Sequence, residues 1–209
     1  MDSYSEPVIL SKAPWLKVGV VSDTHVPDRA AALHPDLVAA LEAEDVDLIF
    51  HLGDISIPAV VKTLEEIAPV YAVRGNRDLF YGRALPRALR LKLNGTKTTL
   101  LHGQGGLADY VIDKWFYLRQ GYAFERYERV LLRLAPQARV IIFGHTHRPE
   151  TRWEQDRLFF NPGAAANPGA RKLKPTFGIL WYHSEGYVEG KIIPLDGAQL
   201  INRRWRRDG

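Results

Sequence analysis

Two histidines separated by one residue, His145 and His147, stand directly after the apolar run 140–143 of this 209-residue chain. Imidazole nitrogens at this spacing, at the end of a buried strand, are typical of a metal site. Four more apolar runs are each followed by side chains that offer oxygen or imidazole ligands, namely Asp23 and His25, Asp54, Asn76, and His102. Because five strand ends deliver such ligands, we expect one shared metal site at one edge of a sheet.

The spacing of these residues suggests how they are presented. Asp23 and His25 have the same separation as the two later histidines, and on an extended segment such residues point the same way. We therefore expect each pair to bind one cation. Gly53 precedes Asp54 and is expected to let the backbone come close to the metal.

The chemical types of the ligands restrict which metal ions can bind. The chain has no cysteine, so thiolate ligands are excluded. A mixture of carboxylate, amide and imidazole favours Mn²⁺, Fe²⁺, Zn²⁺, Co²⁺ or Ni²⁺ over Ca²⁺ or Mg²⁺, and we take Mn²⁺ as the first choice.

The number of ligands predicts two ions that share a bridging carboxylate, because a single ion with open positions cannot use seven ligands. Two cations about 3.5–4 Å apart polarise a substrate oxygen and lower the pKa of a bridging water from about 15.7 toward about 7. The hydroxide then attacks an electrophile. Phosphorus is the natural one, since the cations also bind non-bridging phosphoryl oxygens.

The elements that must position these ligands alternate in the first third of the chain. The periodicity predicts strands near 17–21, 47–51 and 70–74, with helices over 36–44 and from Pro58 onward. Such a β-α-β-α-β series forms a parallel sheet with right-handed crossovers. Ligands of such sheets bind beyond the carboxyl ends of the strands, where the polar motifs stand.

The rest of the sequence predicts a second sheet. The run 89–93 alternates with period two, and Asn94-Gly95 predicts a tight turn before a strand at 98–101. Helices are expected over 109–118 and 124–134. Further strands are expected over 140–143, 157–160, 176–183 and 187–193. The fold class is therefore α/β, with two sheets face to face and helices outside.

Five motifs in order, Asp-x-His, Gly-Asp, Gly-Asn-x-Asp, His-Gly and Gly-His-Thr-His, resemble the blocks of the calcineurin-like metallophosphoesterases. The resemblance spans about 18–163. The short chain and Asn161-Pro162-Gly163 are similar to the small prokaryotic phosphodiesterase branch, to which the retromer subunit of this fold is related. The resemblance implies a four-layer α/β/β/α sandwich of two mixed sheets flanked by helices. The same resemblance implies one metal at Asp23, His25, Asp54 and His147, and a second at Asp54, Asn76, His102 and His145.

The residues expected to take part in catalysis are Asn76, Arg77, Asp78 and His102. One position departs from the family, because many members have histidine where this chain has Arg77. Arginine keeps its proton near neutral pH, so we expect Arg77 to hold a phosphoryl oxygen rather than to act as a general acid. This favours substrates with good leaving groups. Asp78 is predicted either to orient Arg77 through an ion pair or to cap a turn.

Composition sets the remaining expectations. Apolar residues make up 46% and charged residues 25%, with a net charge of +4, which is ordinary for a soluble globular protein. We expect a single domain over 1–209, with an N-terminal extension over 1–14 and a basic, frayed C-terminal tail over 198–209. The sequence shows no signal peptide and no membrane span, so a cytoplasmic protein is expected.

Three functions remain open. The leading one is a dinuclear phosphodiesterase acting on a small organic phosphodiester. A nuclease or nucleotide phosphatase is the alternative suggested by the arginine-rich tail, although no extended basic-aromatic surface supports it. A non-catalytic scaffold is disfavoured, because converging buried charges are costly without a function. The aromatic region 115–127 is interpreted as core, as a pocket wall or as the interface of a homo-oligomer.

Overall fold

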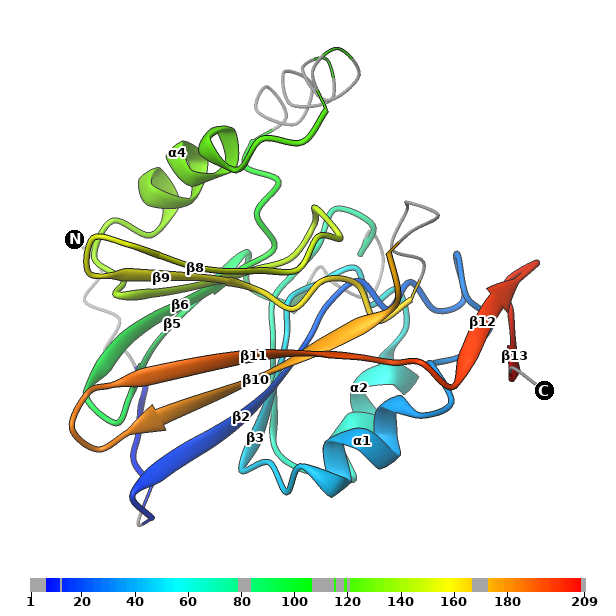
Figure 1. Cartoon of the computed structure of the whole chain (residues 1–209), viewed down its shortest axis with the longest axis horizontal. Helices are drawn as coiled ribbons and strands as arrows, with labels where there is room; N and C mark the ends of the chain where they lie inside the picture. Colours follow the sequence, from blue (N-terminus) through cyan, green and yellow to red (C-terminus); the bar gives the residue numbers. More distant parts are fainter. Residues whose placement is uncertain are drawn as a thin grey trace.

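Two β-sheets pack face to face and helices cover both outer surfaces (Figure 1). The computed structural model describes residues 7–11, 13–78, 84–106, 115, 119, 121–166 and 173–207. The strand order is β1-β5-β6-β7-β9-β8 in one sheet and β11-β10-β2-β3-β4 in the other. This is the four-layer α/β/β/α sandwich that the sequence resemblance implied.

The five-stranded sheet contains the predicted β-α-β-α-β series. Its parallel strands are β2 (Trp15–Val21), β3 (Leu48–His51) and β4 (Val70–Ala72). The connecting helices are α1 (Leu37–Ala43) and α2 (Pro58–Glu65), and Pro58 starts α2 as expected. On the other side of β2 the sheet continues with two antiparallel strands, β10 (Thr176–His183) and β11 (Val188–Pro194).

The six-stranded sheet is mixed. It contains β1 (Val8–Ile9), β5 (Ala88–Leu93), β6 (Thr96–Leu101), β7 (Val140–Phe143), β8 (Glu150–Glu154) and β9 (Arg157–Asn161). Asn94 and Gly95 make the predicted turn between β5 and β6, with φ of 42° and 82°. Strands β6, β7 and β9 run parallel. We did not predict β1 or β8, because β1 has two residues and β8 is a partly exposed edge strand of mostly polar residues.

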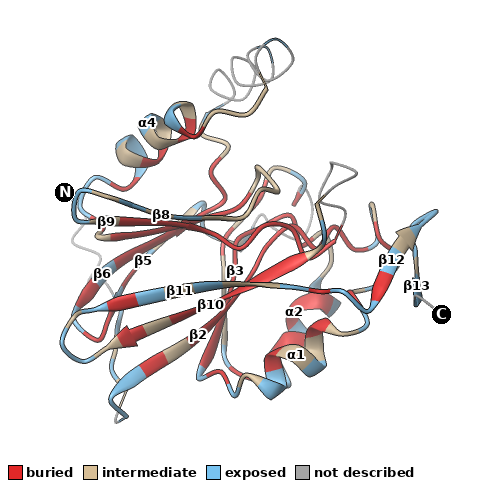
Figure 2. Ribbon diagram, in the orientation of Figure 1, coloured by how far each residue is buried: buried red, intermediate tan, exposed pale blue. Residues whose placement is uncertain are grey.

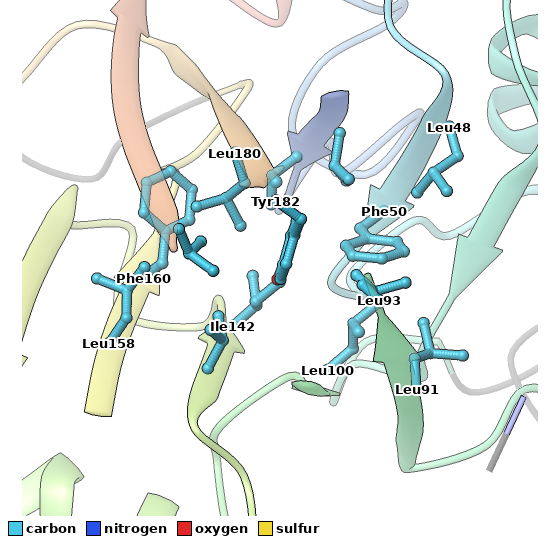
Figure 3. Packing of buried hydrophobic residues seen from close by; sticks show 14 of the residues in the cluster. Leu48, Phe50, Leu91, Leu93, Leu100, Ile142, Leu158, Phe160, Leu180 and Tyr182 are labelled. Carbon is cyan, nitrogen blue, oxygen red and sulfur yellow. The ribbon is translucent and has the colours of Figure 1, made fainter. Parts of the chain in front are cut away.

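Three apolar layers hold the sandwich together. The inner layer lies between the sheets, where Phe50, Ile142 and Leu180 are fully buried (Figure 3). A second layer joins α1 and α2 to the five-stranded sheet. A third joins α4 (Phe124–Leu134) to the six-stranded sheet, and the buried parts of α1, α2 and α4 face the strands (Figure 2). None of the described helices is long and apolar enough to cross a membrane.

This packing assigns part of the aromatic region 115–127 to the core. Phe124 and Tyr127 are buried against the six-stranded sheet, as the core interpretation predicted. Tyr122 stacks on Tyr127 at a ring distance of 5.4 Å. Of the helix expected over 109–118, only Trp115 lies within the described residues, so the rest of that prediction is outside them.

The C-terminal segment is not the frayed tail that we expected. It forms a hairpin of β12 (Ala198–Ile201) and β13 (Arg204–Arg207). Trp205 donates a 2.9 Å hydrogen bond from its indole nitrogen to the carbonyl of Ala32, and its ring meets His34 edge-on at 4.5 Å. The expectation was wrong because these contacts reach about 170 residues back along the chain, where no local pattern reveals them.

Candidate metal centre

The motif residues lie at the carboxyl ends of strands from both sheets. Asp23 and His25 follow β2, Asp54 follows β3, and Asn76 follows β4 in the five-stranded sheet. His102 follows β6, and His145 and His147 follow β7 in the six-stranded sheet. Asp23, His25, Asp54 and His102 are buried, with exposed fractions of 0–3%. The site therefore lies where the ends of the two sheets meet.

One group of ligand atoms gathers around Asp23. Its Oδ1 atom lies 3.1 Å from His147 Nε2 and 3.6 Å from His25 Nε2. The two imidazole nitrogens are 3.2 Å apart. These three atoms are close enough together to bind one metal ion. Asp23 and His25 thus lie together as expected, and His147 joins them. The expectation that His145 and His147 share one cation was wrong, because His145 contacts Asn76 instead.

A second group of ligand atoms gathers around Asp54. Asp54, Asp23 and His102 together could hold another ion. His102 Nε2 lies 3.5 Å from Asp54 Oδ1 and 3.1 Å from Asn76 Oδ1. His145 Nδ1 lies 3.0 Å from the same Asn76 oxygen. The other carboxylate oxygen of Asp54, Oδ2, lies 3.8 Å from His25 Nδ1. Asp54 therefore lies between His25 of the first group and His102 of the second.

Charge and protonation within the site suit cations. Burial raises the pKa of Asp23, but His147 and the other imidazoles outweigh burial and hold this pKa well below its usual value. Burial lowers the pKa of His25 to about 3, so this imidazole is neutral at pH 7 and offers a lone pair. Burial also raises the pKa of Asp54, against the opposing effect of His102.

Two buried ligand atoms lack hydrogen bonds. Asp23 Oδ1 and His25 Nδ1 have no hydrogen-bond partner among the described residues. A buried polar atom without a partner is costly, and a bound cation would supply the missing interaction of Asp23 Oδ1, the oxygen that faces the nitrogens of His25 and His147. The donor set and this unpaired oxygen therefore fit divalent metal ions.

Five of the seven proposed ligands have a left-handed backbone conformation. Asp23, His25, Asp54, His145 and His147 all have positive φ, between 49° and 67°. Our expectation that the paired residues lie on extended segments was therefore wrong. In each pair the two ligands are left-handed residues separated by one other residue, a conformation that costs about 1–3 kcal/mol per residue and is found mainly at functional sites.

Two glycines allow the second and third motifs to touch. A Cβ atom on Gly53, which has φ of +96°, would lie 2.5 Å from the backbone nitrogen of Gly75. A Cβ atom on Gly75 would lie 2.2 Å from both the backbone nitrogen and Oδ1 of Asp54. The glycine before Asp54 thus permits contact with the neighbouring motif, and this contact sets the position of the carboxylate.

Asp78 joins the same two motifs and does not orient Arg77. Its Oδ2 atom accepts hydrogen bonds from the backbone nitrogens of Asp54 at 2.9 Å and Gly75 at 2.8 Å. Its Oδ1 atom accepts from Ile55 and Ser56, both at 2.8 Å. Of the two predictions for Asp78, the turn-capping one is confirmed and the ion pair with Arg77 is wrong.

Arg77 lies at the rim of the site. Its guanidinium contacts the carboxylate of Asp28 at 2.5 Å, and both side chains are 41% exposed. Its backbone nitrogen donates a 2.8 Å hydrogen bond to Asp54 Oδ1. We did not identify Asp28 from the sequence. Its only signal was its position three residues after His25.

Other side chains fix the orientation of the ligands. His102 Nδ1 lies 2.7 Å from the carbonyl oxygen of Leu52, so this nitrogen carries the proton and Nε2 is left to face the site. Asp23 Oδ2 accepts hydrogen bonds from Ser22 Oγ at 2.6 Å and from the backbone nitrogen of His145 at 3.1 Å. His51 Nε2 contacts Thr24 Oγ1 at 3.2 Å, which places His51 behind the first motif as a packed, supporting residue.

Asn161 supports the last motif. Its amide nitrogen donates to the carbonyl of Gly144 and to Thr146 Oγ1, both at 3.0 Å. Its oxygen accepts from the backbone nitrogen of Gly163 at 2.9 Å. The amide of Asn161 is thus used within the protein, where it holds the loop that carries His145 and His147.

Comparison with known proteins agrees with this geometry. Residues 16–185 match the model of the calcineurin-like phosphoesterase superfamily domain. A probable metallophosphoesterase of Methanothermobacter thermautotrophicus is 36% identical over 91% of this chain and 99% of its own length. A phosphodiesterase of Methanocaldococcus jannaschii is 28% identical over 83% of this chain and 98% of its own length.

The fold has relatives among solved structures. Vps29 from Chaetomium thermophilum superposes with a TM-score of 0.62 at 20% identity, covering 86% of this chain and 93% of Vps29. At this identity the likeness concerns the fold alone. The match over 16–185 and the archaeal relative at 36% identity cover most of the sequence. The chain belongs to the calcineurin-like phosphoesterase superfamily.

Proposed function

We propose that this protein is a dinuclear metal-dependent phosphodiesterase that hydrolyses a small organic phosphodiester. The observation that carries the proposal is the position of Asp54, with Oδ1 3.5 Å from His102 Nε2 and Oδ2 3.8 Å from His25 Nδ1. A carboxylate that lies between one histidine of each ligand set is the arrangement that a pair of bridged cations needs.

The ligands divide into two sets. Asp23, His25, Asp54 and His147 would hold one ion, and Asp54, Asn76, His102 and His145 would hold the other. Mn²⁺ is our first choice, with Fe²⁺, Zn²⁺, Co²⁺ and Ni²⁺ as alternatives. When bound, two such ions would polarise the phosphoryl group and activate water near neutral pH.

The protein contributes orientation and charge. His102 is held by the Leu52 carbonyl and Asp54 by the backbone of Arg77, so neither ligand has to reorganise when the substrate binds. Arg77 is proposed to exchange part of its contact with Asp28 for a phosphoryl oxygen. Because Arg77 gives up no proton near neutral pH, the leaving group departs without a side-chain acid from this position, which favours esters with acidic leaving groups.

A phosphodiester is preferred over the alternatives for two reasons. The Methanocaldococcus relative is named a phosphodiesterase. The nuclease interpretation depended on free arginines in the tail, yet Arg203 donates to the carbonyl of Pro27 and Arg207 pairs with Asp36 at 3.0 Å. Two of the four tail arginines thus have partners within the protein.

The test compares two chromogenic esters. The protein is stripped of metal, Mn²⁺ is added back, and hydrolysis of bis(p-nitrophenyl) phosphate and p-nitrophenyl phosphate is measured. We expect Mn²⁺-dependent hydrolysis with preference for the diester, reduced at least about 100-fold in Asp54→Asn. The matched control is Asp156→Asn, which makes the same change at a side chain that is 85% exposed. No turnover of either ester with Mn²⁺, Zn²⁺ or Fe²⁺, despite bound ions, would favour the scaffold instead.

A further inference from the structure

A cavity of about 350 Å³ lies beside the proposed metal centre. Its wall includes Arg74, Asn76, Arg87, Gln104 and the backbone of Gly105 and Gly106. Asn76 belongs to both the cavity and the ligand set, since its Oδ1 atom lies 3.1 Å from His102 Nε2. A substrate whose phosphorus sits at the metal centre can therefore extend into this cavity past Asn76.

The fold brings the two arginines together. The backbone nitrogen of Arg74, just after β4, donates a 2.8 Å hydrogen bond to the carbonyl of Pro86. This bond sets Arg87 beside the end of β4. In the β5–β6 pairing Ala88 lies opposite Leu101, so Arg87 also stands next to the strand end that carries His102. Both cations are thus held at the cavity by main-chain structure from two different sheets.

Neither guanidinium is neutralised within the described part of the chain. Arg74 and Arg87 make no side-chain hydrogen bond or ion pair with any residue that the structure describes. Arg77 differs, because Asp28 compensates its charge at 2.5 Å. No carboxylate is present among the described residues of the cavity wall. Two uncompensated arginines in one cavity favour an anion, and guanidinium groups are well suited to phosphate and carboxylate.

Neutral donors add to this preference. Gln104 offers an amide group, and Gly105 has φ of 68°, a backbone conformation that commonly occurs where successive N–H groups form an anion-binding concavity. The wall therefore combines two positive charges with polar groups and no competing acid among its described members.

We propose that the cavity binds a second anionic group of the substrate, so that the preferred substrate is a phosphodiester carrying a further phosphate or carboxylate. This inference rests on the proposed phosphodiesterase function and defines its substrate class. Arg74 and Arg87 bind the second anion, while the ester to be cleaved lies at the metal centre.

The test uses two nucleotide esters that differ by one phosphate. Thymidine 5′-(p-nitrophenyl phosphate) carries the diester alone, and its 3′-phosphorylated form carries a second anion. Water cleaves either one to p-nitrophenolate and a thymidine nucleotide. We expect the Mn²⁺-loaded protein to show a kcat/KM at least about tenfold higher for the 3′-phosphorylated ester, which is the effect of one good charge-assisted contact.

Variants assign the preference to the cavity. Arg74→Gln and Arg87→Gln should each lower the ratio of the two kcat/KM values severalfold, and the double variant should bring it near one. The matched control is Arg90→Gln, which removes the same charge from an exposed arginine of β5 outside this cavity. A wild-type ratio near one, or a ratio unchanged in the double variant, would overturn the proposal.

A binding measurement separates failure of this inference from failure of the proposed function. Calorimetric titration compares thymidine 3′,5′-bisphosphate with thymidine 5′-monophosphate and needs no turnover. If neither ester is hydrolysed, the phosphodiesterase proposal fails, while tighter binding of the bisphosphate that depends on Arg74 and Arg87 still supports the anion site. If both esters are hydrolysed and both nucleotides bind equally, only the anion site is refuted.

Discussion

Replacing Asp78 with alanine should destabilise the protein strongly, although this side chain is not a metal ligand. Its carboxylate is 1% exposed and accepts four backbone hydrogen bonds of 2.8–2.9 Å. A hydrogen bond to a charged group contributes about 1.5–3 kcal/mol, so the four together set an upper limit of about 6–12 kcal/mol. Relaxation of the loop and entry of water reduce this, and single changes rarely exceed about 5 kcal/mol. We expect a loss of at least about 3 kcal/mol.

A second variant, Asp78→Asn, should lose an intermediate amount of stability. The asparagine oxygen can replace Oδ1 and accept from Ile55 and Ser56, but its amide group then points N–H donors at the backbone nitrogens of Asp54 and Gly75. We expect this variant to lose about half as much stability as the alanine variant.

Urea denaturation of the metal-free protein measures both losses without a contribution from metal binding. The control is Asp156→Ala, because Asp156 is 85% exposed and its 3.3 Å ion pair with Arg139 should contribute less than about 1 kcal/mol. If Asp78→Ala lost no more stability than Asp156→Ala, the assignment of Asp78 as the link between the second and third motifs would be wrong.

Three further predictions concern the last motif, the rim of the site and the C-terminal hairpin. Gly144→Ala places a Cβ atom 2.1 Å from Ser22 Oγ, so metal affinity measured by titration should fall at least about tenfold; Gly95→Ala, which meets nothing within 4 Å, should leave that affinity unchanged. Arg77→Gln should lower kcat/KM for the diester about 10–100-fold, whereas Arg77→Lys should retain part of the wild-type value. Equal activity of the wild-type protein and both variants would exclude a contact between Arg77 and the phosphate. Burial lowers the pKa of His34, so the unfolded chain binds a proton at this imidazole more readily, and the free energy of unfolding should fall as the pH drops below about 6.5. His34→Phe should lose less stability between pH 7.5 and 5.5 than the wild-type protein does. An identical loss would contradict the assignment of this pH dependence to His34.

The fold could be predicted where local pattern and tertiary structure agree. The series from β2 to β4 was expected to within about three residues, because apolar periodicity and Pro58 mark its elements directly. β8 was missed because its alternating exposed positions and polar residues leave little apolar signal. The C-terminal hairpin was mistaken for a tail because it is rich in arginine. Its structure depends on Trp205 and on distant partners such as Ala32 and Asp36.

The candidate site shows the same division between local and distant information. The sequence indicated all seven proposed ligands because each follows an apolar strand, and the structure brings these residues together. It did not indicate how they converge, since left-handed backbone at residues such as Asp23 and His145 has no signature in an aspartate or a histidine. The sequence suggested a turn cap at Asp78 but not its hydrogen bonds to residues 54–56, which lie 22–24 residues away. The contact of Asp28 with Arg77 was hidden because it spans 49 residues.

The presence of two bridged ions at Asp54 is the central claim, and anomalous diffraction from crystals of the Mn²⁺-loaded protein tests it most directly. We predict two anomalous peaks about 3.5–4 Å apart, one on the His25 side and one on the His102 side of the Asp54 carboxylate. Loss of both peaks in Asp54→Asn would identify Asp54 as the shared ligand. A single peak in the wild-type protein would contradict the dinuclear centre, and two peaks that persist in Asp54→Asn would contradict the bridging role of Asp54.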